Sequence, residues 1–273
     1  MTQGTEPAAE EAAPSSEPGP GGGPRRRRGR GGRALAVLGV VGELLITLGL
    51  VLGLFVSYSL WWTDVLADRS ASAASDQLRE SWAAGAPAAP PSGGPSAGPA
   101  AAAATGPVYA AGDGIGFLHV PAMGRDNQVM IRMGTDTATL AEGVAGVYEQ
   151  PYRSAMPWDE SGNFALAAHR DGHGAKFHDL DAVGKGDAIV VETRDKWYVY
   201  RVDSTLPETS KYDTGIVAPV PKGSGYTGPG RYITLTTCTP VYTSRYRMAV
   251  WGSLVRVDDM DAARTPPAEL RQR

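Results

Sequence analysis

The residue with the clearest chemical potential is Cys238, the one cysteine among 273 residues. A single cysteine excludes an intramolecular disulfide and any metal site built from several cysteines. Cys238 follows the β-branched run Tyr232 to Thr237 and precedes Thr239-Pro240. Because proline cannot donate to a continuing strand, we expect Cys238 at a strand end, where its side chain can face a groove. The alternative is a buried, unreactive thiol.

His169 is the candidate partner of this thiol. It follows the apolar run Asn163 to Ala168 and precedes a polar, glycine-rich segment. A cysteine nucleophile needs a base or a nearby cation to populate the thiolate, and histidine can supply either. Two strand ends could bring the two residues together. A partly exposed histidine at a turn is the alternative for His169.

A metal site is not expected from the nearby histidines His169, His173 and His178. A histidine pair four residues apart shares a face only on a helix, and Gly172 and Gly174 disfavour a helix here. We therefore predict no bound metal.

Two arginines close to Cys238 could supply a fixed positive charge. Acyl transfer through a thioester passes through oxyanion intermediates, and a cation at the developing charge lowers the barrier. Arg245 and Arg247 have the same parity, so alternation does not choose between them. We favour Arg247, because it begins the apolar run Met248 to Val257, and expect Arg245 to be a surface or substrate-contacting residue.

The elements that position these residues have strand character. Short β-branched and aromatic runs alternate with Gly and Pro turns, which predicts an all-β barrel or sandwich of seven or eight strands. A short helix is expected over Thr137 to Ala145. The predicted strands are Ile115–Val120, Gln128–Met133, Asn163–His169, Ala188–Thr193, Trp197–Leu206, Tyr232–Thr237 and Met248–Val257.

The first part of the chain has a different organisation. Residues 1–33 are expected to be a disordered tail that ends in an arginine cluster, and residues 34–62 a transmembrane signal anchor. The charge-free run from Leu44 to Trp62 would be about 28 Å long as a helix, close to the ~30 Å hydrocarbon layer. Glu43 would then lie at the interface. The arginines before the span place the N-terminus in the cytoplasm and the rest outside.

The remaining boundaries follow from composition. Residues 63–107 are expected to form a juxtamembrane segment, with a helix over 64–82, and an Ala/Gly/Pro-rich linker. Residues 108–260 are the predicted catalytic domain and residues 261–273 a C-terminal tail. The formal net charge of -3 gives no general case for nucleic-acid binding.

Together these segments resemble the sortases, a family of cysteine transpeptidases. Residues 234–238 read Thr-Leu-Thr-Thr-Cys and resemble the family signature Thr-Leu-Xaa-Thr-Cys. Residues 165–170 resemble its histidine strand, with Ala168 where many relatives carry glycine. Arg247 matches the catalytic arginine. The likeness covers about Ile115 to Val257.

The resemblance implies a sortase-type closed β-barrel and a defined reaction. Cys238 would attack the Thr-Gly bond of a C-terminal sorting signal on a secreted protein, and His169 would protonate the leaving amine. An amine of a peptidoglycan precursor such as lipid II would then release the acyl group. Arg247 would stabilise the oxyanion or position the substrate, and Thr237 would line the same groove.

Among sortases, Thr239-Pro240, the segment 242–247 and the Ala-, Gly- and Arg-rich composition look most like the class E housekeeping enzymes of actinobacteria. This class implies a Leu-Ala-Xaa-Thr-Gly preference over Leu-Pro-Xaa-Thr-Gly. Some sortases of another class bind calcium through acidic loops. No matching acidic cluster is evident, so no cofactor is expected.

Two alternatives differ in function. A pilin-polymerising sortase would use a lysine of another subunit as acceptor, but the aspartate-aromatic lid motif of such enzymes is absent from the linker before Val108. A non-catalytic, membrane-tethered β-barrel binding module would keep Cys238 as a structural residue. The Ser-His-Gly-Cys pattern of L,D-transpeptidases is absent from the sequence.

Overall fold

The computed structural model describes residues 30–58, 62–85 and 109–271. The chain divides into two compact units, Met1–Leu52 and Gly53–Arg273. Most of the expected N-terminal tail and linker, residues 1–29 and 86–108, lies outside the described residues. So do residues 272–273 of the expected C-terminal tail.

Helix α1 (Arg30–Ser57) contains the apolar stretch predicted to span a membrane. Leu35–Ser57 is long and apolar enough to cross a bilayer, and none of it is buried against protein. The helix begins before Leu44, so Glu43 lies inside it rather than at its start. It also ends before Trp62, which instead precedes the next helix. Residues 59–61 lie outside the described residues, so the expected helical run to Trp62 stays a prediction.

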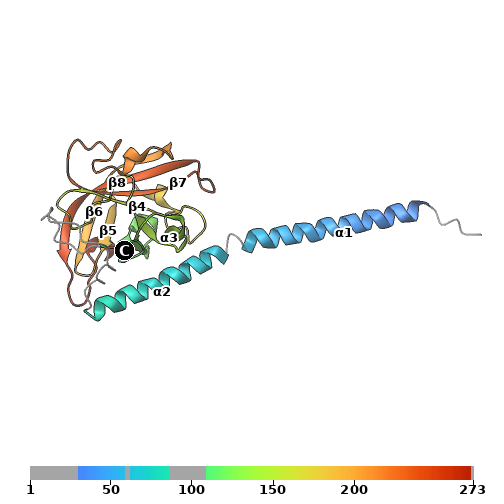
Figure 1. Ribbon diagram of the computed structural model, residues 1–273, viewed down its shortest axis with the longest axis horizontal. Coiled ribbons are helices and arrows are strands. Elements are labelled where there is room, and N and C mark those ends of the chain that lie inside the picture. The colour runs from blue at the N-terminus through green and yellow to red at the C-terminus, as the bar shows by residue number, and fades with distance from the viewer. Residues whose placement is uncertain (1–29, 59–61, 86–108, 272–273) are drawn as a thin grey trace, which may run out of the picture. The chain divides into compact units, whose positions relative to one another are not determined.

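Helix α2 (Thr63–Ala83) matches the juxtamembrane helix expected over 64–82. It runs along the side of the β-barrel, as Figure 1 shows. Ala67 and Ala71 are buried there. Further along, Leu78 and Trp82 pack against Phe117 and neighbouring residues of the barrel wall. The helix is thus part of the same compact unit as the barrel.

Eight strands close into a barrel, which confirms the predicted fold class. Their order around the barrel is β1-β2-β3-β4-β7-β8-β6-β5. The pairs β2–β3 and β4–β7 are parallel, and the others are antiparallel. The strands are β1 Gly114–His119, β2 Val129–Met133, β3 Ala145–Val147, β4 Gly162–Ala167, β5 Ala188–Glu192, β6 Lys196–Ser210, β7 Arg231–Thr239 and β8 Tyr246–Asp259.

Short helices connect the strands. Helix α3 (Thr137–Ala141) is capped by Asp136, whose side chain accepts from the backbone N–H groups of Ala138 and Thr139. It ends earlier than predicted, because residues 145–147 pair as β3 instead. The other short helices are α4 (Ala268–Arg271) and the 3-10 turns Pro121–Met123, Leu180–Ala182 and Thr214–Val217.

Strands β4, β7 and β8 are buried on both faces, each against a different cluster. One face points into the barrel and carries Phe164, Leu166, Leu235 and Val250 among others. The alternate residues face outward and join a second cluster with Ile216 and Val217 from the segment that covers this wall. Because successive side chains point to opposite faces, parity along these strands decides whether a residue faces the barrel interior or the outside.

Glu192, at the end of β5, is a buried carboxylate that joins α2 and the C-terminal segment to the barrel. Its oxygens lie 3.2 Å from Arg79 Nη1, 3.0 Å from His119 Nε2 and 2.9 Å from Arg264 Nη2. Burial by itself would raise the pKa of Glu192. Hydrogen bonds from His119 and Arg264 and the charge of Arg79 outweigh it and lower the pKa to about 2.

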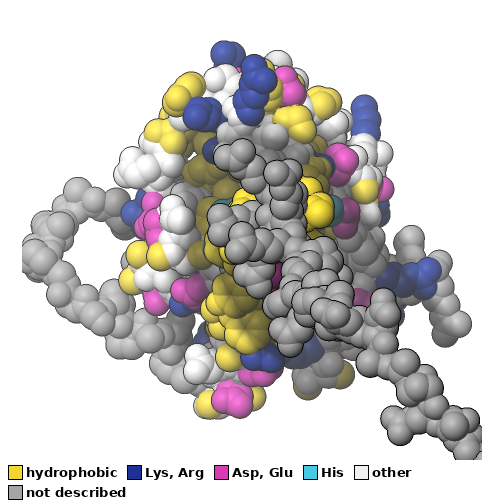
Figure 2. Space-filling view, turned by 90° about the vertical axis from the view of Figure 1, so that its right-hand side faces the viewer, with side chains coloured by type: hydrophobic (Ala, Val, Ile, Leu, Met, Phe, Trp, Pro, Cys, Tyr) yellow, Lys and Arg dark blue, Asp and Glu magenta, His cyan; other side chains and the backbone are white. Residues whose placement is uncertain are grey.

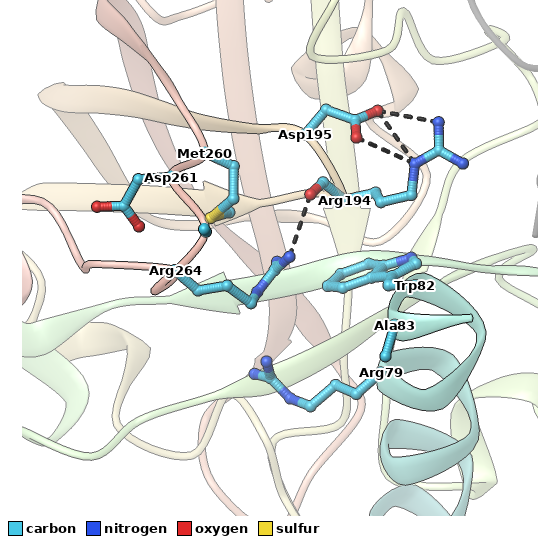
Figure 3. Close-up of a pocket in the computed structure, with 9 residues that line it drawn as sticks. Arg79, Trp82, Ala83, Arg194, Asp195, Met260, Asp261 and Arg264 are labelled. Atoms are coloured by element: carbon cyan, nitrogen blue, oxygen red, sulfur yellow. Dashed lines mark hydrogen bonds and ion pairs between the residues drawn. The ribbon is translucent and has the colours of Figure 1, made fainter. Parts of the chain in front are cut away.

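A pocket of about 490 Å³ lies beside this carboxylate, where α2 meets the C-terminal segment. Figure 3 shows Arg264 reaching past Trp82 toward the carbonyl of Arg194, to which it donates. The exposed surface in Figure 2 carries Lys and Arg side chains interspersed with acidic and hydrophobic ones. That face is therefore of mixed charge.

Candidate active site

Cys238 lies near the end of β7 and is paired across the sheet with Arg247 of β8. The strand continues one residue further than expected and ends at Thr239, directly before Pro240. Directly opposed residues on neighbouring strands have side chains on the same face, about 4.5–5.5 Å apart at Cβ. The thiol is partly exposed. The pairing therefore puts a thiol and a guanidinium side by side on one face.

His169 reaches the same place through the parallel pairing of β4 with β7. Ala167 is in register with Thr236, and the Ala168 N–H donates to the Thr236 carbonyl at 3.3 Å. His169 lies two residues after Ala167, and Cys238 lies two residues after Thr236, so the two occupy corresponding positions along the parallel strands. Because neighbouring strands lie about 4.8 Å apart, this register brings the end of β4 that leads to His169 beside the end of β7 that carries Cys238. The regular strand ends at Ala167, two residues earlier than predicted.

These side chains lie outside the barrel. Ala249, two residues after Arg247, belongs to the outward-facing cluster with Ala165 and Trp251. Leu235 and Met248, of the opposite parity, belong to the interior. Cys238 and Arg247 thus extend the outer face to the end of the sheet, where the covering segment no longer buries them.

Thr237 has the opposite parity to Cys238 and lies on the interior side. It is 3% exposed, and its hydroxyl donates to the Ala168 carbonyl at 2.8 Å. The side chain therefore bridges β7 to the segment that carries His169. This differs from the expectation that Thr237 lines the groove.

The two candidate arginines have different environments. Arg247 lies inside β8, partly buried, and its Nη1 donates to the carbonyls of Tyr246 at 2.9 Å and Ser244 at 3.2 Å. Arg245 precedes the strand, is exposed, and places its guanidinium over the Tyr246 ring at 5.1 Å. The backbone of Arg247 is the better held of the two, as its position in the sequence predicted.

The imidazole of His169 has an unusual environment. Its Nε2 is buried without a hydrogen-bond partner among the described residues. Its ring centroid lies 5.0 Å from that of His173. Burial lowers the pKa of His169, the nearby His173 lowers it further, and Asp171 opposes both. A buried ring nitrogen without a partner is available to exchange a proton with a ligand in the groove.

Asp171 links the segments that follow β4 and β7. Its Oδ2 accepts from the backbone N–H of Tyr242 at 2.6 Å, and its Oδ1 is buried with no partner among the described residues. Sequence reasoning had treated this residue only as part of a turn. The available signal was the polar Asp171-Gly172 pair, which follows His169 after one intervening residue.

Tyr148 is a further residue that sequence reasoning missed. Its hydroxyl lies 3.0 Å from Thr236 Oγ1. Burial raises the pKa of Tyr148, the Thr236 hydrogen bond and Arg247 lower it, and Cys238 raises it, so the phenol is close to both site residues. It was missed because β3, the short strand that ends at Val147 and so positions it, was not predicted. The available signal was the aromatic Tyr148 directly after the short apolar run Ala145–Val147.

The arrangement is suited to acyl transfer. A partly exposed thiol, an imidazole with a free nitrogen and a fixed guanidinium share one face of the sheet. Thioester chemistry requires a nucleophile, a proton carrier and an oxyanion-stabilising group, and side chains of these three types can supply them. Among the described residues, no group of three His, Cys, Asp or Glu side chains could hold a metal ion.

Comparisons with known proteins agree with this chemistry. The sortase domain model matches residues 118–255. Sortase SrtE2 of Streptomyces coelicolor is 51% identical over 93% of this chain and 95% of its own length. Sortase SrtE1 of the same organism is 42% identical over 82% of this chain, which covers 59% of that relative.

Solved structures show the same relationship. The crystal structure of sortase E1 from Streptomyces coelicolor with a tripeptide in its active site matches with a TM-score of 0.55 and 45% identity, over 60% of this chain and 99% of that one. Sortase E from Streptomyces avermitilis matches with a TM-score of 0.52 and 34% identity, over 60% of this chain and 100% of that one. The chain therefore belongs to the sortase family of cysteine transpeptidases and resembles its class E members.

Proposed function

We propose that this protein is a membrane-anchored sortase in which Cys238, His169 and Arg247 carry out transpeptidation. The observation that supports these roles is the strand register. It pairs Cys238 with Arg247 and brings His169 alongside from β4, all on one outward face. The interior parity of Thr237 suggests a supporting role for that residue, in which it fixes the distance between the two strands.

The proposed reaction has two acyl-transfer steps. The Cys238 thiolate attacks the carbonyl carbon of the Thr-Gly bond, and Arg247 stabilises the negative charge on the carbonyl oxygen. When the bond breaks, His169 gives a proton to the glycine amine and a thioester remains. The second amine attacks this thioester, His169 accepts the proton, and the thiolate leaves.

The substrates follow from the similarity to class E. The donor is a secreted protein with a C-terminal signal of the Leu-Ala-Xaa-Thr-Gly or Leu-Pro-Xaa-Thr-Gly kind. The acceptor is an amine of a peptidoglycan precursor such as lipid II. Arg245, exposed beside the Cys238–Arg247 pair, is placed to contact the substrate rather than the reacting atoms.

The membrane topology is also part of the proposal. Residues 34–62 are the signal anchor, with α1 as its helix, and residues 108–260 are the catalytic domain. Leu35–Ser57 would be about 35 Å long, which is sufficient for a hydrocarbon layer of about 30 Å. Arg25 to Arg28 precede the span and favour a cytoplasmic N-terminus with the barrel outside.

Peptide cleavage tests the reaction directly. The full-length protein in detergent micelles would be mixed with fluorogenic peptides of the two signal types and with either a peptidoglycan-type amine or a lysine-bearing pilin peptide. We expect cleavage with formation of a transfer product, and none with Cys238→Ala. Preference for the lysine peptide would favour the pilin-polymerising alternative. Folded protein that cleaves neither signal would contradict the proposed substrate class.

The role of Arg247 can be separated from that of its neighbour. Arg247→Ala should lower kcat/KM by about 10²–10³, in the range of losing one oxyanion-stabilising group. Arg245→Ala is the matched control, because it removes the same side chain two residues away. Equal losses in both variants would show that general positive charge, rather than the pairing with Cys238, matters.

Topology can be tested with the same cysteine. Because Cys238 is the one cysteine in the chain, a membrane-impermeant maleimide reports on the location of the barrel. Labelling in intact protoplasts would place the site outside. Labelling only after lysis would place it in the cytoplasm and overturn the proposed orientation.

A further inference from the structure

Helix α2 is fixed to the barrel at its C-terminal half. Trp82 meets the edge of the Phe117 ring with a centroid distance of 5.5 Å, and Arg264 covers Trp82 at 4.7 Å. Arg79 reaches the buried Glu192. The buried Ala67 lies further toward the N-terminus of the helix. The helix is therefore a rigid element whose N-terminal half has a set position on the barrel.

That N-terminal half contacts the segment that follows His169. Asp64 Oδ1 accepts from the backbone N–H of Gly174 at 2.8 Å. Asp68 Oδ1 lies 2.6 Å from Lys176 Nζ. Gly143 approaches so closely that an added Cβ would lie 3.2 Å from the Ala67 carbonyl oxygen. Two carboxylates of one helix thus hold two points of the same short segment.

The held segment has a backbone conformation that it does not adopt easily by itself. Four successive residues have positive φ: Gly172 at 62°, His173 at 50°, Gly174 at 76° and Ala175 at 40°. The left-handed region is unfavourable for non-glycine residues, here His173 and Ala175. Such a conformation persists only where surrounding contacts determine it. The contacts from α2 help to hold the segment in this conformation.

The conformation of this segment decides what His169 faces. It brings the His173 ring to 5.0 Å from the His169 ring, and it places Asp171 against the N–H of Tyr242. We propose that Asp64 and Asp68 are positioning residues for transpeptidation, which hold residues 171–176 so that His173 packs on His169. This inference rests on the proposed catalytic role of His169.

The arrangement predicts a change in titration when the contacts are lost. The titratable groups that act on His169 are His173 and Asp171, both on its own segment. Burial and then His173 lower the pKa of His169, while Asp171 raises it. If the segment moves away, His169 becomes better solvated and loses its neighbour His173. Its pKa then rises, and the limb of the pH profile that it controls moves to higher pH.

The test compares the full-length protein in detergent micelles with Asp64→Ala/Asp68→Ala. We expect kcat/KM to fall about three- to tenfold, as for the loss of one or two hydrogen bonds. The His169-dependent limb should move to higher pH, and the His169 ring resonance in histidine-labelled protein should titrate at higher pH. Asp76→Asn, an exposed carboxylate on the same helix, should change none of these.

Two further variants separate positioning from loss of folding. Asp64→Asn keeps an oxygen that can accept from Gly174 and should retain most of the activity. The exchange Asp68→Lys with Lys176→Asp should restore the profile that Asp68→Lys shifts. An unchanged His169 titration in the double alanine variant overturns the inference, even if activity falls. Because this resonance needs no substrate, it gives an answer even if neither sorting peptide is cleaved.

Discussion

Two buried polar clusters are connected to opposite halves of α2, one directly through Arg79 and the other through the segment that Asp64 and Asp68 hold, and they differ in how their polar atoms are satisfied. Both oxygens of Glu192 accept from cationic side chains of three separate segments. Near the other half of the helix, His169 Nε2 and Asp171 Oδ1 are buried without partners among the described residues. Buried polar groups in proteins are nearly always paired, so unpaired ones need an explanation.

The difference separates two tasks of the barrel. At Glu192, complete pairing joins α2, β5 and the C-terminal segment, which favours the folded state. Beside Cys238, incomplete pairing leaves a proton-carrying nitrogen and a carboxylate oxygen open to a ligand. We therefore expect substitutions at the first cluster to change stability and substitutions at the second to change rate.

The largest expected effect is at the unsatisfied cluster. His169→Ala should lower kcat/KM by about 10²–10⁴, the usual contribution of a positioned acid or base. The melting temperature of this variant should stay near that of the wild type, because the buried Nε2 has no hydrogen-bond partner among the described residues that could be lost. The measurement pairs peptide turnover with thermal unfolding, and His178→Ala, an exposed histidine nearby, is the control. A large fall in melting temperature would contradict the separation.

The satisfied cluster should show the opposite behaviour. Glu192→Ala leaves two arginines and His119 without their carboxylate and should lower the free energy of unfolding by about 3 kcal/mol. This loss is at the lower end of the range expected for breaking a buried ion pair, because the side chains of Arg79 and Arg264 remain 38% and 30% exposed and can be hydrated. Chemical denaturation measures this, with exposed Glu80→Ala as control. Lost turnover at a temperature where the variant is folded would argue that the clusters are coupled.

Acid should weaken the same cluster. The folded pKa of Glu192, about 2, lies below its ordinary value of 4.5. Its contribution to stability is therefore complete above pH 4.5 and is lost as pH falls toward 2. The loss should reach about 2 kcal/mol by about pH 3. Glu192→Gln should flatten this part of the stability profile in thermal unfolding. An identical acid dependence in wild type and variant would show that other carboxylates dominate.

The smallest effect is expected at Thr237, which combines a paired polar group, as at Glu192, with a position in the candidate site. Its hydroxyl is satisfied by Ala168, yet the residue is next to Cys238. Thr237→Val should cost about 1 kcal/mol of stability, the value of one hydrogen bond, with a small change in kcat/KM. Thr237→Ser, which keeps the hydroxyl, is the control. A rate loss comparable to that of His169→Ala would instead place Thr237 in the chemistry.

The sequence predicted much of the barrel because its strands are long and rich in β-branched residues. Strand β3 was missed because Ala145–Val147 is too short to show alternation, and its pairing with β2 and β4 forms it. The helix before it was overextended for the same reason.

The candidate site was predictable where it depended on the chain order around Cys238. Arg247 was favoured from its place at the start of an apolar run, and the register places it opposite the cysteine. The groove role of Thr237 stays a prediction; the family signature does not give the parity of its side chain, which here lies on the interior side. Asp64 and Asp68 could not be found, since the helix that carries them lies more than a hundred residues away from Gly174 in the sequence.

The parallel pairing of β4 with β7 has a consequence for folding. A parallel pair needs a long crossover, and here the chain between Ala167 and Arg231 must be in place before the two strands can meet. Contacts between residues far apart in sequence form slowly. Until that pairing forms, the register does not hold the end of β4 that leads to His169 beside Cys238. On the mechanism proposed above, the thiol therefore acquires its histidine partner only after β4 and β7 have met.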